Sequence, residues 1–270
     1  MRKTMWMIAV LWLLAACQSA PAQPTPIPFT PSGAEIIQWL RSPQAVVFRA
    51  DITAGVVAAD AADNELSALN EIPRCTIYGD NRVVWVNELG PFTIEVLYDI
   101  VPDEVIRAFI DYLTVDERIY TYTTRADAAS GGETLPVVEQ VTLAVNGVEH
   151  RADGFSGWDA DWFNRVTRAC QTISGAPVLY APEGAWITVR EAAFDLQAPI
   201  VQWLPGAGTT LNLGALAEAS EARWLADANL PLLWDYLHTL PPNLLFAEGD
   251  RYFEIALQVP GITRDAPAAP

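Results

Sequence analysis

Few side chains of this 270-residue chain could perform covalent catalysis or bind a metal. Lys3 is the only lysine, and it lies in the leader described below. The rest of the chain therefore has no P-loop lysine, no Schiff-base lysine and no Ser–Lys dyad. Because His150 and His238 are the only histidines, one chain cannot build a three-histidine zinc site. We expect no catalytic constellation, no metal site and no cofactor.

Cys17 carries the clearest chemistry in the sequence. Arg2 and Lys3 form a basic start, and Met5 to Leu14 form an apolar stretch of about ten residues, too short to span a bilayer as a mature helix. The stretch ends in Leu14-Ala15-Ala16-Cys17, which looks like the lipobox of bacterial lipoproteins. We expect residues 1–16 to be a lipoprotein signal peptide and the Cys17 thiol to carry fatty acyl chains such as palmitate. The alternatives are an uncleaved anchor and an ordinary signal peptide.

The segment after Cys17 predicts a spacer. Residues 17–33 contain five prolines and no periodic apolar pattern, which favours an extended, semi-rigid segment. We expect a globular region over 34–263, with a sub-boundary near 174–178 as an open alternative, and a flexible tail over 264–270. The chain would then be lipid-anchored on the extracytoplasmic side of the cell membrane.

Net charge limits the partners. The formal charge is -17, and it becomes more negative once Arg2 and Lys3 leave with the leader. Such a surface repels phosphate backbones and anionic lipid heads, so we expect no nucleic-acid binding and membrane attachment only through the N-terminal lipid. A protein or glycan partner stays open.

Cys75 and Cys170 are the remaining cysteines. In an exported, oxidising setting they are candidates for a disulfide that closes a loop of about 95 residues and stabilises the fold by several kcal/mol. Two separately buried thiols are the alternative.

Other candidate residues have simpler structural explanations. His150 and His238 fit packed positions, and Ser156 fits a helix cap better than a nucleophile elbow. The acidic pairs Asp99/Asp103 and Glu248/Asp250 could serve glycan cleavage, but with 33 acidic residues such pairs arise by chance. Trp158 and Trp186 could present an aromatic binding surface for sugars, or they could fill the core.

Hydrophobic patterning and turn chemistry then predict the elements that position these residues. The strongest single signal is Asn146-Gly147 between alternating strands, which is typical of a tight hairpin. Strands are expected at 45–52, 75–78, 82–86, 92–101, 141–145, 148–152, 178–180, 185–190, 244–247 and 251–259. Helices are expected at 35–40 (short), 102–113, 156–173, 215–227 and 231–240.

Two hairpins place Gly-Asp at the turn and an arginine shortly after it, at Tyr78-Gly79-Asp80-Asn81-Arg82 and Glu248-Gly249-Asp250-Arg251-Tyr252. Either turn chemistry alone or an internal duplication explains this likeness. Together with the Asn-Gly hairpin between them, the order of segments from Val46 to Val259 resembles a loose group of uncharacterised secreted bacterial lipoproteins. The resemblance implies no activity and no site residues.

The expected fold class is α+β, with antiparallel hairpins or sheets covered by several helices and, as an alternative, two similar halves. The expected function is a membrane-tethered, non-enzymatic binding or structural module. The alternative is a hydrolase of envelope glycans that uses carboxylates alone.

Overall fold

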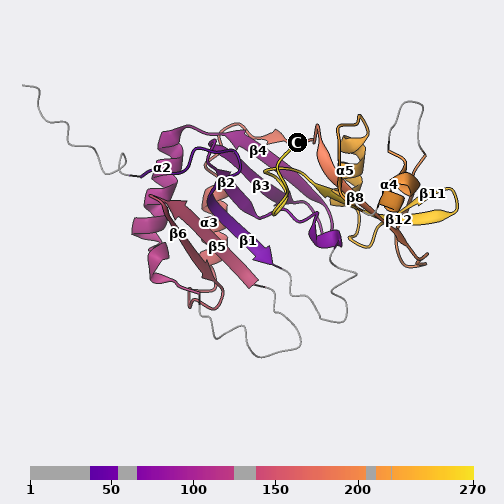
Figure 1. Ribbon diagram of the computed structural model, residues 1–270. Coiled ribbons are helices and arrows are strands. Elements are labelled where there is room, and N and C mark those ends of the chain that lie inside the picture. The colour runs from indigo at the N-terminus through magenta and orange to yellow at the C-terminus, as the bar shows by residue number, and fades with distance from the viewer. Residues whose placement is uncertain (1–36, 54–65, 125–137, 205–210, 220) are drawn as a thin grey trace, which may run out of the picture. The chain divides into compact units, whose positions relative to one another are not determined.

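The computed structural model describes residues 37–53, 66–124, 138–204, 211–219 and 221–270. These residues belong to one compact unit, Gly33–Pro270. Two β-sheets and several short helices make up this unit (Figure 1).

The larger sheet has seven strands in the order β6-β5-β1-β2-β3-β4-β7, and every neighbouring pair is antiparallel. Its strands are β1 (Val46–Thr53), β2 (Cys75–Tyr78), β3 (Arg82–Glu88), β4 (Ile94–Ile100), β5 (Val138–Val145), β6 (Val148–Asp153) and β7 (Val178–Leu179).

The smaller sheet has five strands in the order β10-β8-β12-β11-β9. Its pairs are antiparallel except for β9 and β11, which run parallel. Its strands are β8 (Ala185–Ala192), β9 (Ile200–Gln202), β10 (Arg223–Leu225), β11 (Leu245–Glu248) and β12 (Arg251–Gln258).

The helices are short. The α-helices are α2 (Asp103–Asp111), α3 (Trp162–Gln171), α4 (Leu213–Ala219) and α5 (Leu230–Thr239), and α2 continues into the π-helical turn η2 (Tyr112–Asp116). A 3-10 turn, η3 (Ile119–Thr121), follows.

The predicted α+β class, with antiparallel hairpins covered by helices, is wrong. Strands account for 34% and helices for 23% of the structure, so the fold is dominated by strands and the helices do not form the covering layer that the prediction assigned to them. The reason lies in the two faces of the larger sheet. Helices α2 and α3 pack on one face, whereas apolar side chains of β2, β3 and β4 on the other face join the core of the smaller sheet. The elements around the smaller sheet therefore cover the apolar side chains of β2, β3 and β4, where the prediction expected helices alone.

The two cores follow strand alternation. Phe48 and Ala50 of β1 belong to the first core, with Val141 and Leu143 of β5 and the apolar stripes of α2 and α3. Val84 and Val96, from strands β3 and β4, belong to the second core. Because side chains alternate along a strand, these two groups lie on opposite faces of the same sheet.

Two turns show why their residues suit the fold. Asn146 and Gly147 both have positive φ, 54° and 74°, as a tight two-residue hairpin requires, so the Asn-Gly hairpin is confirmed. At the β2–β3 turn, Asn81 has φ 69°, and a Cβ atom on Gly79 would lie 2.0 Å from the carbonyl oxygen of Leu40. Close backbone approach therefore requires glycine at position 79.

Several predicted elements need correction. The helix predicted over 156–173 begins only at Trp162, and the helix predicted over 215–227 ends at Ala219 and is followed by strand β10. Residues 37–40 are not helical. The alternative of two similar halves also fails, because the first hairpin has antiparallel neighbours on both sides whereas β11 has the parallel neighbour β9.

Candidate functional site

The face of the larger sheet opposite α2 and α3 changes from mostly apolar to polar between β2 and β1. The row Tyr98, Val84 and Thr76 runs from β4 to β2 and is buried or half-buried. The same row continues through Arg49 of β1, Thr142 of β5 and Arg151 of β6. The half of this face on β1, β5 and β6 is therefore polar, while the half on β2, β3 and β4 is mostly apolar.

Two in-register rows form the floor of this polar half. Residues paired across antiparallel strands point to the same face. The basic row is Arg151, Thr142 and Arg49; the acidic row, two residues along each strand, is Asp153, Gln140 and Asp51. Since neighbouring strands lie about 4.8 Å apart, the Cα atoms of Arg49 and Arg151 are about 10 Å apart, with the Thr142 hydroxyl between their side chains.

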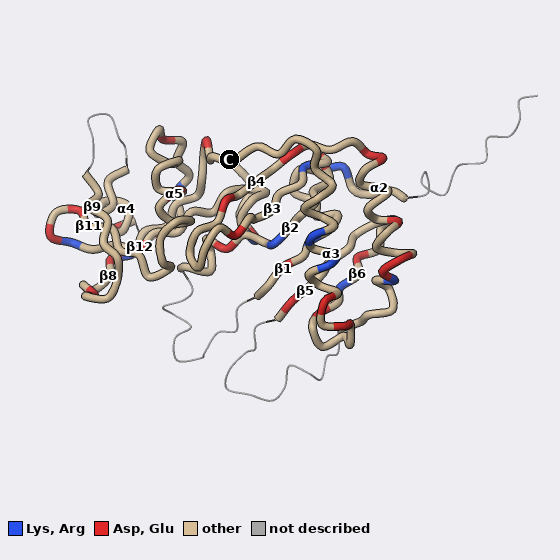
Figure 2. The backbone as a smooth tube through the Cα atoms, turned by 180° about the vertical axis from the view of Figure 1, so that it is seen from behind, with Lys and Arg blue, Asp and Glu red and all other residues tan. Residues whose placement is uncertain are grey.

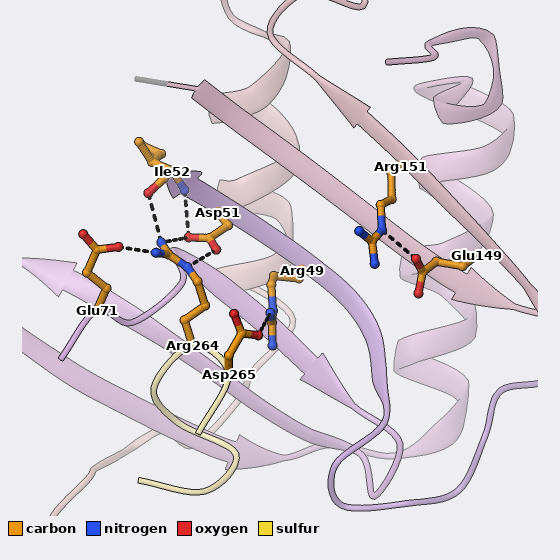
Figure 3. Close-up of polar contacts among 8 residues, drawn as sticks. All are labelled: Arg49, Asp51, Ile52, Glu71, Glu149, Arg151, Arg264 and Asp265. Atoms are coloured by element: carbon orange, nitrogen blue, oxygen red, sulfur yellow. Dashed lines mark hydrogen bonds and ion pairs between the residues drawn. The ribbon is translucent and has the colours of Figure 1, made fainter. Parts of the chain in front are cut away.

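The C-terminal segment contributes two more side chains (Figure 3). Arg264 donates from Nε to Asp51 Oδ2 at 2.6 Å and from Nη2 to Asp51 Oδ1 at 2.7 Å, and it also pairs with Glu71. The next residue, Asp265, has its Oδ1 atom 3.6 Å from Nη1 of Arg49. We call the resulting hollow of about 400 Å³ the β1 basin. The side chains of the two rows line it, together with Arg264, Asp265, Thr53 and Thr124.

Electrostatics in the β1 basin follow from these contacts. Burial opposes the charge of Arg264, but hydrogen bonds and charges from Asp51 and Glu71 outweigh burial and raise the pKa of Arg264 above its ordinary value. Beneath Arg49, burial raises the pKa of Tyr78, and the positive charge of Arg49 partly offsets that rise. Arg49 therefore lies between a buried phenol and the exposed carboxylate of Asp265. Figure 2 shows that basic positions gather on the part of the chain that carries the larger sheet.

There are two further hollows. One of about 340 Å³ shares Asp51 and Arg264 with the β1 basin, and the other, of about 500 Å³, lies along α3 and shares no residue with the basin. In the second, Arg74 pairs with Glu88, and Gln171 donates to the backbone carbonyl oxygens of Arg74 and Val86. The Gln171 side chain therefore holds the end of α3 against the sheet, which gives it a structural role.

The predicted disulfide between Cys75 and Cys170 is present. It joins β2 to α3 with a Cα–Cα distance of 6.3 Å and closes a sequence separation of 95 residues. Both residues belong to the first core. The disulfide therefore fastens α3 to the face of the sheet opposite the β1 basin.

Trp158 and Trp186 do not come together. Trp158 stacks on Trp162 with ring centroids 4.7 Å apart and packs against the first core. Trp186 lies on β8 of the smaller sheet, contacts Trp224 edge-on, and donates from Nε1 to the carbonyl oxygen of Ala268. The structure therefore places each of them in a separate aromatic cluster, and neither lines the β1 basin.

Each histidine ring donates a hydrogen bond to a backbone carbonyl oxygen. His150 pairs with Leu143, as the hairpin register predicts, and its Nε2 donates to the carbonyl oxygen of Ile119 at 3.0 Å. His238 is buried, and its Nδ1 donates to the carbonyl oxygen of Trp234 at 2.7 Å. Burial lowers the pKa of His238, so its ring stays neutral near neutral pH.

Asp99, Asp103 and Glu248, three of the four residues in the acidic pairs named from the sequence, have structural partners. Asp99 accepts from the Ser174 hydroxyl at 2.7 Å, and this bond, with help from backbone N–H groups, lowers the pKa of Asp99. Hydrogen bonds from Arg41 and then Asn81 lower the pKa of Asp103 well below its usual range.

Glu248 accepts backbone N–H groups at the start of α4, from Leu213 at 3.1 Å and Gly214 at 2.9 Å. Ser156 is not the cap of α3. Its hydroxyl accepts the backbone N–H of Asp153 in the turn after β6.

Cys17 and the leader lie outside the described residues. Over the part of the chain that the structure describes, no helix is both long and apolar enough to cross a membrane. No group of three or more His, Cys, Asp or Glu side chains is placed to hold a metal ion within that same part.

Sequence reasoning missed the β1 basin. One usable signal was the alternation Phe48-Arg49-Ala50-Asp51, in which two charged residues share the face opposite two buried ones. The other contributors, Arg264 and Asp265, fall in the segment predicted as a flexible tail, where no periodic pattern indicates a contact. No family model, curated protein or solved structure matches this chain.

Proposed function

We propose that this chain is a lipid-anchored, extracytoplasmic module that binds a small ligand in the β1 basin and catalyses no reaction. The observation that carries the proposal is that one face of the larger sheet is apolar and buried on one half and polar and hollowed on the other. Strands β2, β3 and β4 bury that face in the second core, whereas β1, β5 and β6 line a hollow of about 400 Å³ with polar side chains. A volume of that size is typical of small-molecule sites, which use a few convergent polar groups for specificity.

The carboxylate chemistry favours binding over glycan hydrolysis. A glycosidase needs one carboxyl group whose pKa is raised so that it can donate a proton at neutral pH. Side-chain hydrogen bonds lower the pKa of five carboxyl groups, which are Asp99, Asp103, Glu117, Asp159 and Glu191. These groups therefore stay ionised and act as hydrogen-bond acceptors.

The anchoring half of the proposal draws on the leader and the disulfide. A disulfide between Cys75 and Cys170 fits a chain that folds outside the reducing cytoplasm. We expect that replacing Cys17 by Ser releases the protein from the membrane fraction. Retention of the Cys17→Ser variant in that fraction, after a salt wash that removes peripheral proteins, would contradict the lipid anchor.

The binding half has its own test. Native mass spectrometry of the mature chain, incubated with the small-molecule pool of the cell envelope, should detect a ligand adduct. The basin-blocked variant Thr142→Trp should lack that adduct, and Gln140→Trp serves as a second blocked variant in case the first misfolds. Thr188→Trp is the matched control, because Thr188 is also half-buried but lies on β8 of the smaller sheet. An equal adduct in the blocked and control variants, or no adduct at all, would overturn ligand binding in the β1 basin.

A further inference from the structure

The carboxylates of the acidic row in the β1 basin already accept hydrogen bonds from other groups of the protein. Asp51 accepts two hydrogen bonds from Arg264, at 2.6 and 2.7 Å. Asp153 is buried, and its Oδ1 accepts the backbone N–H of Phe155 at 3.0 Å and the Ser156 hydroxyl at 3.4 Å. These carboxylates therefore hold the C-terminal segment and the turn after β6, which leaves the basic row to meet a ligand.

Apart from the buried Tyr78 hydroxyl beside Arg49, the described partners of the basic row are carboxylates at the protein surface. Arg151 donates from Nε to Glu149 at 2.6 Å, with both side chains more than half exposed. Nη1 of Arg49 lies 3.6 Å from Asp265, which is beyond hydrogen-bond distance, and the Asp265 side chain is 81% exposed. The Arg49 Nε is buried and has no hydrogen-bond partner among the described residues. Arg49 is therefore an incompletely paired cation facing a loosely held carboxylate.

We propose that the ligand of the β1 basin carries a carboxylate or phosphate group that binds Arg49 in place of Asp265, with Arg151 as the second cation and the Thr142 hydroxyl between them. The inference rests on the proposed function and names the ligand's chemical class. A guanidinium presents a planar fork of donors that matches an oxyanion, so a free carboxylate or phosphate can make the paired contacts that Asp265 does not make.

The negative charge of the protein favours a small ligand over an extended polyanion. The whole chain has a formal charge of -17, so an extended polyanion meets repulsion outside the basin. A small oxyanion meets the two arginines at close range, while more distant charges are screened within about 8 to 10 Å at physiological salt.

Asp265 is then an internal competitor of the ligand. Removing its charge should strengthen binding, whereas removing the charge of Arg49 should weaken it. A purely structural ion pair does not give opposite effects from its two partners. We expect Asp265→Asn to lower the Kd about threefold, and Arg49→Met or Arg151→Met to raise it about tenfold.

The local field can be measured without a ligand. In a Thr142→Cys variant of the mature chain, an anionic methanethiosulfonate reagent should react faster than a cationic one, relative to the same ratio at a Thr188→Cys control. Adding Arg49→Met should reduce this preference. Equal ratios at positions 142 and 188 would overturn the basic character of the β1 basin.

Ligand chemistry is tested by calorimetric titration of the mature chain with succinate and with inorganic phosphate, using succinamide as the uncharged control. Binding of succinate alone identifies a carboxylate ligand, binding of phosphate alone identifies a phosphate ligand, and either supports the proposal if Asp265→Asn strengthens it. Arg74→Met and Glu88→Gln, which remove a surface ion pair outside the basin, should leave the Kd unchanged. No binding to either the wild type or Asp265→Asn would overturn the proposal.

Failure of this inference can be told apart from failure of the proposed function. If the envelope ligand is lost in Thr142→Trp but kept in both Arg49→Met and Arg151→Met, the basin binds a ligand of another class, so the proposed function stands and the oxyanion inference falls. If the Thr142→Trp variant keeps the ligand, both fall. Arg151 is mostly exposed, so its variant provides a folded test even if Arg49→Met is unstable.

Discussion

Arg264 lies over the end of β1 and pairs through two nitrogen atoms with both carboxylate oxygens of Asp51, 213 residues earlier in the chain. The side chains are only 18% and 8% exposed, so this ion pair is largely buried. It holds the C-terminal segment against the larger sheet and thereby sets the position of Asp265 beside Arg49.

Replacing Arg264 by Met should lower the free energy of unfolding by about 3 kcal/mol, because Asp51 would remain as a buried charge without its main partner. The double variant Asp51→Asn/Arg264→Met should cost less than the sum of the single variants, since neither buried charge remains. Urea unfolding measures both. Arg251→Met removes an exposed pair with Glu191 and should cost less than about 1 kcal/mol. If Arg264→Met and Arg251→Met lowered the free energy of unfolding equally, burial of the Asp51–Arg264 pair would make no difference to its contribution to stability.

The disulfide should contribute strongly to stability because it closes a long loop. Because Cys75 and Cys170 are separated by 95 positions in the sequence, we expect Cys75→Ala/Cys170→Ala to lower the free energy of unfolding by about 2 to 5 kcal/mol. The intact mass of the wild type should rise by two hydrogen atoms on reduction, and thiol labelling of the unreduced protein should leave both residues unmodified. Labelling of either residue without a reductant would contradict the bridge.

His238 should make stability depend on pH near neutrality. Burial lowers the pKa of His238 in the folded chain, whereas the unfolded chain has an ordinary histidine pKa of about 6.5. Below that pH the unfolded chain binds a proton that the folded chain does not, so the free energy of unfolding falls as the pH decreases, by up to about 1.4 kcal/mol per pH unit.

The experiment compares the His150→Gln variant with His150→Gln/His238→Gln, so that His238 is the only histidine that differs. The double variant should be less stable at pH 7.5, because it loses the hydrogen bond to the Trp234 carbonyl. Its urea midpoint should change less between pH 7.5 and 5. Parallel pH profiles for the two proteins would rule out His238 as the source.

Local signals predicted the local structure well. The Asn146-Gly147 hairpin, its register through Leu143 and His150, and helix α5 all follow from turn residues and periodicity within about ten positions. The Cys75–Cys170 pair was also available from the sequence, because these are the only two cysteines that follow Cys17.

Long-range contacts could not be predicted in the same way. Strands β9 and β10 have only three residues each and depend on neighbours that are distant in sequence. Nothing in the sequence around Arg264 indicates that its partner is Asp51. The error in fold class has the same origin, because the continuous apolar run Val83 to Val86 in β3 marks two buried faces without indicating whether a helix or a second sheet covers each one.

Gly79 offers a sharp test of close backbone packing at the β2–β3 turn. A Cβ atom there would lie 2.0 Å from the Leu40 carbonyl oxygen and 2.7 Å from that of Ser42, so Gly79→Ala must push the 40–42 segment away from the turn. We expect a loss of about 2 kcal/mol or more in the free energy of unfolding. Gly154→Ala is the matched control, because a Cβ at Gly154 meets nothing within 4 Å among the described residues.

The Gly154 variant should stay within about 0.5 kcal/mol of the wild type, or become slightly more stable because alanine restricts the unfolded chain. Urea unfolding of the two variants in the same buffer decides the matter. Because neither glycine has a positive φ, backbone preference contributes little to the difference between them. Similar stability of the two variants would mean that the 40–42 segment yields at little cost. Its contact with the β2–β3 turn, close to Arg41 and Asp103, would then not be a rigid part of the fold.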